Sequence, residues 1–225
     1  MQTNRRGFIH LAGLGWAMCV SAVTPTLAAP SADTDPLAIF AKRVSVRHYK
    51  SDPVPEEHLR LILDAARHPP TSGNQQPWKF LVVRDRAKIE RMRTRTLEFF
   101  ETLWPKGLAP AERTAHKEAD TKYVAGYFTA PVYIVVLTDS QSIYPSYNHW
   151  DGPMAAGYLA PAARALGYGT VFVTDTIPEE VTREVLNIPK RYERVCFMPL
   201  GVPDGWPEPT PKKKLDEFIV NESFE

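Results

Sequence analysis

Two arginines and a serine alternate with valines early in the chain, in the run Arg43-Val44-Ser45-Val46-Arg47. In an extended segment, alternate side chains point to the same side, so Arg43, Ser45 and Arg47 are expected to share one face. Two guanidinium groups and a hydroxyl suit a phosphate group, because each planar guanidinium can pair with two phosphate oxygens. On its own, the cluster could also be an exposed basic edge of a sheet.

A second polar cluster is the loop from Pro69 to Pro77, with the sequence Pro-Pro-Thr-Ser-Gly-Asn-Gln-Gln-Pro. This loop offers backbone donors, hydroxyl groups and carboxamide groups close together. Such groups can hydrogen-bond the pyrimidine edge of a flavin ring, which presents both donors and acceptors. An ordinary turn rich in proline and glycine remains the alternative.

Taken together, the two clusters resemble the opening of the nitroreductase family: Arg-x-Ser-x-Arg, followed by Pro-[Thr/Ser]-Ser-x-Asn-x-Gln-Pro-Trp. The resemblance covers nearly all of the chain after residue 36. It continues in Ala130-Pro131, Ala165-Leu166-Gly167, Leu200-Gly201-x-Pro203 and the lysines before Leu215. It implies an α+β sandwich, in which helices flank a mixed, mainly antiparallel sheet. It also implies an intertwined homodimer with FMN at the subunit interface.

The resemblance further implies a role for each residue of the two clusters. Arg43, Ser45 and Arg47 would hold the FMN phosphate and the ribityl chain. The flavin-facing loop would contribute Pro70, Thr71, Ser72 and Asn74 to the cofactor site, with Thr71 and Asn74 approaching the ring from the opposite subunit.

Three more residues match the family's cofactor site later in the chain. Thr174, with Asp175 beside it, falls where the family places a hydrogen-bond donor near flavin N5. Lys212 falls where many members have an arginine on the phosphate. A lysine keeps the positive charge but loses the paired hydrogen bonds of a guanidinium group.

The implied activity is reduction of nitroaromatic, quinone or related electrophilic aromatic compounds by ping-pong hydride transfer through flavin N5. NAD(P)H or another reductant would be the electron donor. Because the flavin carries the hydride chemistry, no catalytic acid, base or nucleophile of the protein is expected.

Two other functions remain open. Dehalogenating relatives, which act on halogenated phenols, place a substrate lid at residues 92–130. Glu98, Lys122 and Tyr123 have the residue types that those relatives use, although their spacing does not match clearly. The second alternative is a non-catalytic flavin-binding carrier.

Composition excludes several other classes. The chain has 225 residues, is 44% hydrophobic and carries a formal net charge of +1, which suits one domain with a sizeable core. It lacks the one-sided basic excess of a nucleic-acid-binding protein. No paired cysteines or closely spaced histidines predict a metal site. Cys196 lies in an apolar run and is expected to be an inert core thiol.

The first 28 residues have the layout of a twin-arginine signal peptide. Arg5-Arg6 precede the uncharged run Leu11–Val23, and Thr26-Leu27-Ala28 supply small residues for cleavage. Such signals export folded proteins that already hold their cofactor. We therefore expect a linker at 29–35, a domain at 36–225 and a periplasmic or otherwise extracytoplasmic mature protein without a membrane segment. An uncleaved membrane anchor is the alternative.

Hydrophobic periodicity predicts helices at 36–42, 55–68, 85–104, 153–166 and 178–186, and strands at 78–83, 131–138, 170–173 and 194–200. Residues 105–122 are expected to be irregular, and residues 140–151 to form a polar, aromatic loop. The resemblance to the nitroreductase family implies that the apolar run 215–220 is a strand that crosses to the partner's sheet.

Overall fold

A computed structural model describes residues 36–224 of the chain. The signal peptide and linker expected at residues 1–28 and 29–35 lie outside this range.

Four strands form the central sheet, in the order β1-β2-β4-β3. They are β1 (Trp78–Val83), β2 (Val132–Asp139), β3 (Gly169–Thr170) and β4 (Tyr192–Gly201). All three pairs of neighbours are antiparallel. Ser45 adds a parallel bridge to Thr170, so the sheet is mixed and mainly antiparallel, as predicted.

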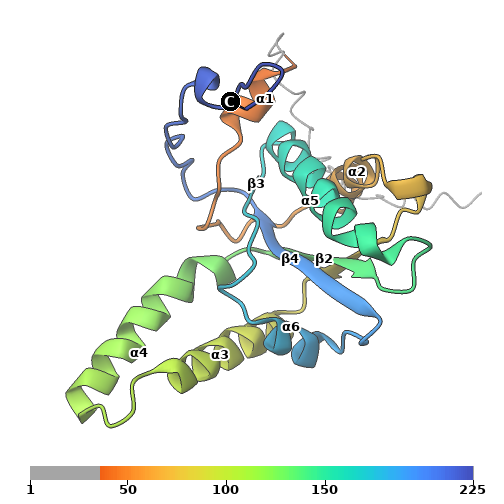
Figure 1. The fold of residues 1–225 in the computed structure, drawn as a ribbon. Coiled ribbons are helices and arrows are strands. Elements are labelled where there is room, and N and C mark those ends of the chain that lie inside the picture. The colour runs from red at the N-terminus through yellow and green to blue at the C-terminus, as the bar shows by residue number, and fades with distance from the viewer. Residues whose placement is uncertain (1–35, 225) are drawn as a thin grey trace, which may run out of the picture. The chain divides into compact units, whose positions relative to one another are not determined.

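Two layers of helices cover the sheet (Figure 1). On one face, α2 (Glu56–Ala66) packs beside α5 (Asn148–Ala165). The other face carries α3 (Arg86–Leu103), α4 (Pro110–Ala125) and α6 (Glu179–Leu186). A short helix, α1 (Ala38–Lys42), precedes the first edge segment.

Strand β2 shows why the molecule has these layers. All eight of its residues are buried, and successive side chains enter opposite cores. Tyr133 and Val135 pack with α3 and α6, whereas Ile134 and Val136 pack with α2 and α5. A strand buried on both faces therefore reads as one continuous apolar run, which is how the sequence predicts it.

The prediction that residues 105–122 are irregular is wrong, because α4 occupies most of that segment. Pro110 stands at the first helical turn, and the Glu112 carboxylate accepts a hydrogen bond from the backbone N–H of Ala109 at 2.8 Å. Val124 is the buried residue of this helix. The helix therefore has almost no apolar stripe, and hydrophobic periodicity misses it.

The polar loop expected at 140–151 is also shorter than predicted. Helix α5 begins at Asn148 and contains Pro153 and Pro161 within it. Because proline is most common in the first turn of a helix, the sequence analysis placed the start of this helix at Pro153, which is too late. The strand predicted at 170–173 is reduced to the two residues of β3 and an isolated bridge from Val173 to Phe197, whereas the remaining helices and strands lie close to their predicted positions.

Residues 215–220 form no strand within the single chain. Leu215–Glu217 is one 3-10 turn, and the whole run is exposed. In the described part of the chain, no helix is long and apolar enough to cross a membrane.

Cys196 is fully buried in β4. Burial raises the pKa of its thiol to about 12, so the group stays protonated at neutral pH. The predicted inert core thiol is confirmed.

Candidate cofactor site

The segment from Arg43 to Lys50 runs as an extra edge of the sheet. The backbone N–H of Val46 donates to the Thr170 carbonyl at 3.0 Å, and that of Lys50 to the Val202 carbonyl at 2.9 Å. Val44 and Val46 face the core. The alternation that the sequence predicts therefore leaves Arg43, Ser45 and Arg47 on the other face of this edge.

These three side chains form a polar cluster that is rich in unused hydrogen-bonding groups. Arg47 Nε donates to the Tyr127 hydroxyl at 2.9 Å, which leaves its two terminal nitrogens available. Within residues 36–224, the Arg43 guanidinium forms no ion pair or hydrogen bond. No described carboxylate competes for either cation.

Thr170 provides a test of whether this edge suits a phosphate-bearing cofactor. Its Oγ1 is buried and has no hydrogen-bond partner in the described structure, and its backbone bridges to Ser45. Buried polar groups are almost always paired, so an unpaired hydroxyl on the strand that bridges to Ser45 fits a bound polar ligand. The sequence analysis missed both Thr170 and Tyr127, because an isolated threonine or tyrosine carries no motif.

The flavin-facing loop has an unusual backbone. Gly73, Asn74 and Gln76 all have positive φ angles, of 56°, 55° and 46°. Thr71 Oγ1 accepts from the Gln76 N–H, and Asn74 Oδ1 accepts from Gln76 Nε2, both at 3.1 Å. The Thr71 hydroxyl and the Asn74 amide nitrogen can still donate to a ligand. Pro70 is exposed, and Ser72 is half-buried.

Within one chain, the two clusters lie at opposite ends of α5. The Ser72 N–H bonds Asp151 near the start of this helix, at 3.3 Å. Val46 contacts Gly169, just beyond its end; a Cβ on that glycine would lie 2.6 Å from Val46. Eighteen helical residues span about 27 Å. The structure therefore does not bring the two clusters together on one ligand.

Thr174 and Asp175 lie on the segment that leaves β3, and both are exposed. The Thr174 carbonyl accepts a hydrogen bond from Arg194 at 2.7 Å. Four extended residues cover about 13 Å, so Thr174 lies at most about that far from Thr170. Lys212 is exposed in the coil after β4, and no contact within the described residues joins it to Arg43, Ser45 or Arg47.

Tyr123 on α4 lies near the same segment. Its hydroxyl is 3.1 Å from Thr176 Oγ1, and its ring neighbours those of Phe100 and Tyr127. This places an exposed aromatic side chain against the segment that contains Thr174 and Asp175, at Thr176. Lys122 is exposed.

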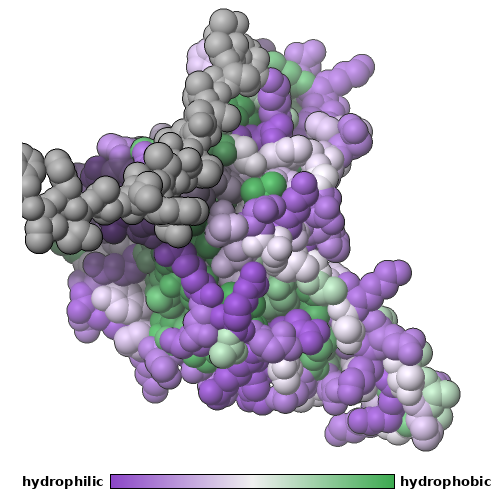
Figure 2. All heavy atoms as spheres, turned by 180° about the vertical axis from the view of Figure 1, so that it is seen from behind, coloured by the Kyte–Doolittle hydropathy of each residue, from purple (hydrophilic) through white to green (hydrophobic). Residues whose placement is uncertain are grey.

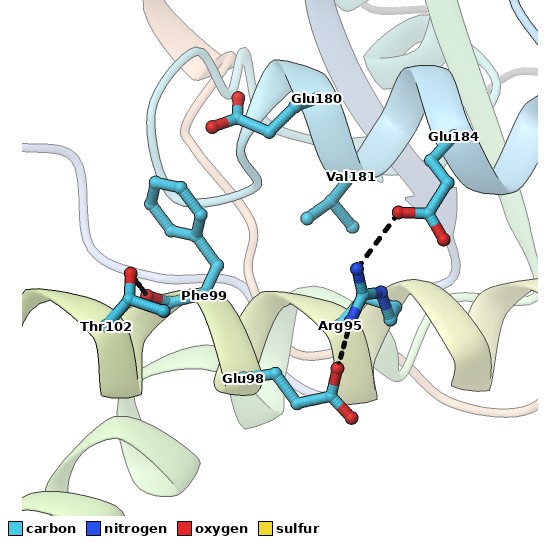
Figure 3. Close-up of a pocket in the computed structure, with 7 residues that line it drawn as sticks. All are labelled: Arg95, Glu98, Phe99, Thr102, Glu180, Val181 and Glu184. Atoms are coloured by element: carbon cyan, nitrogen blue, oxygen red, sulfur yellow. Dashed lines mark hydrogen bonds and ion pairs between the residues drawn. The ribbon is translucent and has the colours of Figure 1, made fainter.

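Glu98 belongs to a different place, shown in Figure 3. A cavity of about 220 Å³ lies between α3 and α6, lined by Arg95, Glu98, Phe99, Thr102, Glu180, Val181 and Glu184. Arg95 bonds Glu98 and also bonds Glu184 at 3.0 Å. The Arg95 guanidinium holds the pKa of Glu184 below its usual range. None of the predicted cofactor residues lines this cavity.

Fold and site together define a layered α+β protein with a cationic sheet edge and a polar loop. The nitroreductase family profile matches residues 40–202. The chain belongs to the nitroreductase family.

Several relatives illustrate the range of this family. The chain is 29% identical over 180 residues to iodotyrosine deiodinase of Thermotoga neapolitana, covering 80% of this chain and 92% of that one. It is 28% identical to pig iodotyrosine deiodinase 1, over 81% of this chain and 66% of that one. It is 32% identical to a putative NADH dehydrogenase/NAD(P)H nitroreductase of Archaeoglobus fulgidus, over 74% and 84% of the two chains.

A solved structure supports the same assignment. A putative nitroreductase from Desulfovibrio desulfuricans, in complex with FMN, superposes with a TM-score of 0.64 at 25% identity. The match covers 85% of this chain and 99% of that one.

Proposed function

We propose that this protein is a dimeric, exported FMN-dependent oxidoreductase that reduces nitroaromatic, quinone or related electrophilic aromatic compounds. Its class and cofactor follow from the family: the chain is an FMN-dependent oxidoreductase. The observation that carries the proposal is the sheet edge with Arg43, Ser45 and Arg47, where Ser45 bridges to Thr170, whose buried hydroxyl has no partner among the described residues.

The residues of this edge would bind the FMN phosphate. Two guanidinium groups supply charge-assisted donors in pairs, and Ser45 and Thr170 supply hydroxyl donors. Thr174 and Asp175 would lie near the ring. When bound, FMN supplies two-electron hydride chemistry at N5, so that the reductant and the aromatic substrate react in turn at one cleft.

Completion of this site requires a second chain. Thr71 and Asn74 lie about one length of α5 from the phosphate edge, so they would reach the FMN ring of the partner subunit. The exposed surface of α5 supports this arrangement. Trp150, Met154 and Tyr158 are 58%, 38% and 44% exposed and recur at every fourth residue, which puts them on one helix face.

The C-terminal arm offers a second contact between subunits. Leu215, Phe218, Ile219 and Val220 are all exposed, which is unfavourable for an isolated chain. Figure 2 shows hydrophobic areas among hydrophilic residues on one face of the molecule. A strand added to the partner's sheet would bury these side chains.

Reductive dehalogenation is the second candidate, because iodotyrosine deiodinases are among the similar proteins. Tyr123 lies where it could contact an aromatic substrate. Glu98 argues against a close match, since it is engaged with Arg95 at another site. A non-catalytic flavin carrier is a third possibility.

Anaerobic reduction of the purified holoprotein separates these functions. NADH, NADPH and a reduced quinone are added in turn while flavin absorbance at the oxidised band is followed. A nitroaromatic, a quinone or an iodotyrosine is then added. Rapid reoxidation by the nitroaromatic or quinone supports the proposal, and iodide release from iodotyrosine would favour the dehalogenase. A flavin that neither accepts nor passes on electrons would identify a carrier.

Export in folded form is part of the proposal and rests on Arg5-Arg6 in the sequence. FMN is anionic and does not cross a membrane unaided, so insertion of the cofactor would precede transport. NAD(P)H would be scarce outside the cytoplasm, which is why a reduced quinone is included among the tested donors.

A further inference from the structure

We infer that Gln75 is a positioning residue, which clamps the flavin-facing loop onto the first turns of α5. The inference rests on the proposed function, because the ligand of this loop is taken to be the FMN ring.

The nitrogen and the oxygen of the Gln75 carboxamide are both hydrogen-bonded. Its Nε2 donates to Asp151 Oδ2 at 2.7 Å and to the Tyr144 carbonyl at 3.1 Å, with Asn148 Oδ1 as a longer contact at 3.4 Å. Its Oε1 accepts from the Tyr144 backbone N–H at 2.7 Å. A carboxamide has two N–H donors, and both are used here, so its orientation is fixed.

Asp151 is the anchor to which the loop is tied. It is 5% exposed and lies in the first turns of α5, where the helix dipole favours a negative charge. Its two oxygens accept from the Ser72 N–H and from Gln75 Nε2. No lysine or arginine of the described chain forms an ion pair with it. These two hydrogen bonds therefore offset the free-energy cost of removing the Asp151 carboxylate from water.

The Tyr144 ring packs against the backbone of the flavin-facing loop at Gly73. A Cβ placed on Gly73 would lie 2.4 Å from Tyr144 Cε2, so the tyrosine ring covers the loop backbone at close range. The left-handed backbone at Asn74 and Gln76 is unfavourable for a residue with a side chain, and least so for asparagine. Tertiary contacts must therefore stabilise this left-handed backbone. Gln75 lies between Asn74 and Gln76, and its side chain supplies hydrogen bonds to Tyr144 and Asp151.

The test compares Gln75→Ala with Gln141→Ala in the holoprotein. Gln141 is an exposed glutamine in the segment that follows β2, and its side chain forms no hydrogen bond with the described residues. Three readouts are taken: the FMN dissociation constant, the visible circular dichroism of bound flavin, and the unfolding temperature. We expect Gln75→Ala to weaken FMN binding about tenfold and to change the flavin spectrum, whereas Gln141→Ala does neither.

A purely structural role would give a different pattern. It would lower the unfolding temperature of Gln75→Ala and leave the flavin affinity and spectrum as in the wild type. That outcome overturns the inference. A wild-type protein unable to bind FMN would overturn the proposed function itself, so the two failures are distinguishable.

Exchange of the carboxamide and the carboxylate between positions 75 and 151 provides a second test. Gln75→Glu places a carboxylate against Asp151 and removes the donor, so it should impair FMN binding more than Gln75→Ala. Adding Asp151→Asn restores a donor and removes the repulsion, and should recover part of the affinity and the spectrum. Equal affinities for Gln75→Glu with and without Asp151→Asn would contradict direct coupling of these two residues.

Discussion

The guanidinium group of Arg194 donates a hydrogen bond to the backbone carbonyl of Thr174 at 2.7 Å. The same group bonds the Ile177 carbonyl at 2.6 Å and Thr182 Oγ1 at 2.9 Å. One side chain of β4 therefore holds the segment in which the family places the donor near the flavin. Burial lowers the pKa of Arg194, although arginine remains charged at neutral pH.

Replacing Arg194 with lysine should disorganise this segment, because an ammonium group cannot make the same set of bonds. We expect a loss of about 1.5–3 kcal/mol in the free energy of unfolding, measured by urea denaturation. Turnover should fall more than FMN affinity. As a control, Arg93→Lys alters an exposed pair with Glu90 and should cost less than about 1 kcal/mol. Equal effects of the two variants would contradict the role of Arg194.

Arg43→Ala tests the phosphate edge directly. Loss of a charge-assisted contact costs about 1.5–3 kcal/mol, which corresponds to a roughly 10- to 100-fold weaker affinity for FMN. Fluorescence titration of the apoprotein measures it. Lys50→Ala, at the other end of the same edge segment, should leave the dissociation constant unchanged. The phosphate role fails if Arg43→Ala binds FMN as tightly as the wild type.

Truncation after Lys214 tests the dimer. It removes the exposed apolar residues of the C-terminal arm and should leave an uncovered sheet edge in the partner. We expect the dimer to dissociate more readily and FMN to be lost with it, both followed by analytical ultracentrifugation at the flavin wavelength. Leu103→Arg, an exposed apolar residue at the end of α3, should leave the dimer intact. A stable monomer that retains FMN would refute the two-chain site.

The double change Arg5→Lys, Arg6→Lys tests folded export. It keeps the charge and the apolar run but removes the arginine pair, so full-length yellow protein should accumulate in the cytoplasm. Cell fractionation and the mass of the purified chain measure this. A general secretory signal reads mainly charge and hydrophobicity and should tolerate the change. Normal export and cleavage of the double mutant would show that the twin-arginine interpretation is wrong.

The sequence by itself determined the family and most of the fold. Local signals were sufficient there: β2 is a continuous apolar run, α2 has a clear apolar face, and the two polar clusters stand at the spacing of a known motif. Those signals fail for a helix or strand that buries few apolar side chains. Helix α4 has one buried residue, so it lacks the apolar face that periodicity requires.

Tertiary structure alone decided how the site is arranged. No sequence pattern places the unpartnered Thr170 hydroxyl beside Ser45, or ties Gln75 to Asp151, because these contacts join segments that are distant along the chain. The same applies to the separation of the two clusters by the length of α5. Spacing in sequence fixes only neighbours on one helix or strand, whereas packing across the sheet decides which distant side chains meet.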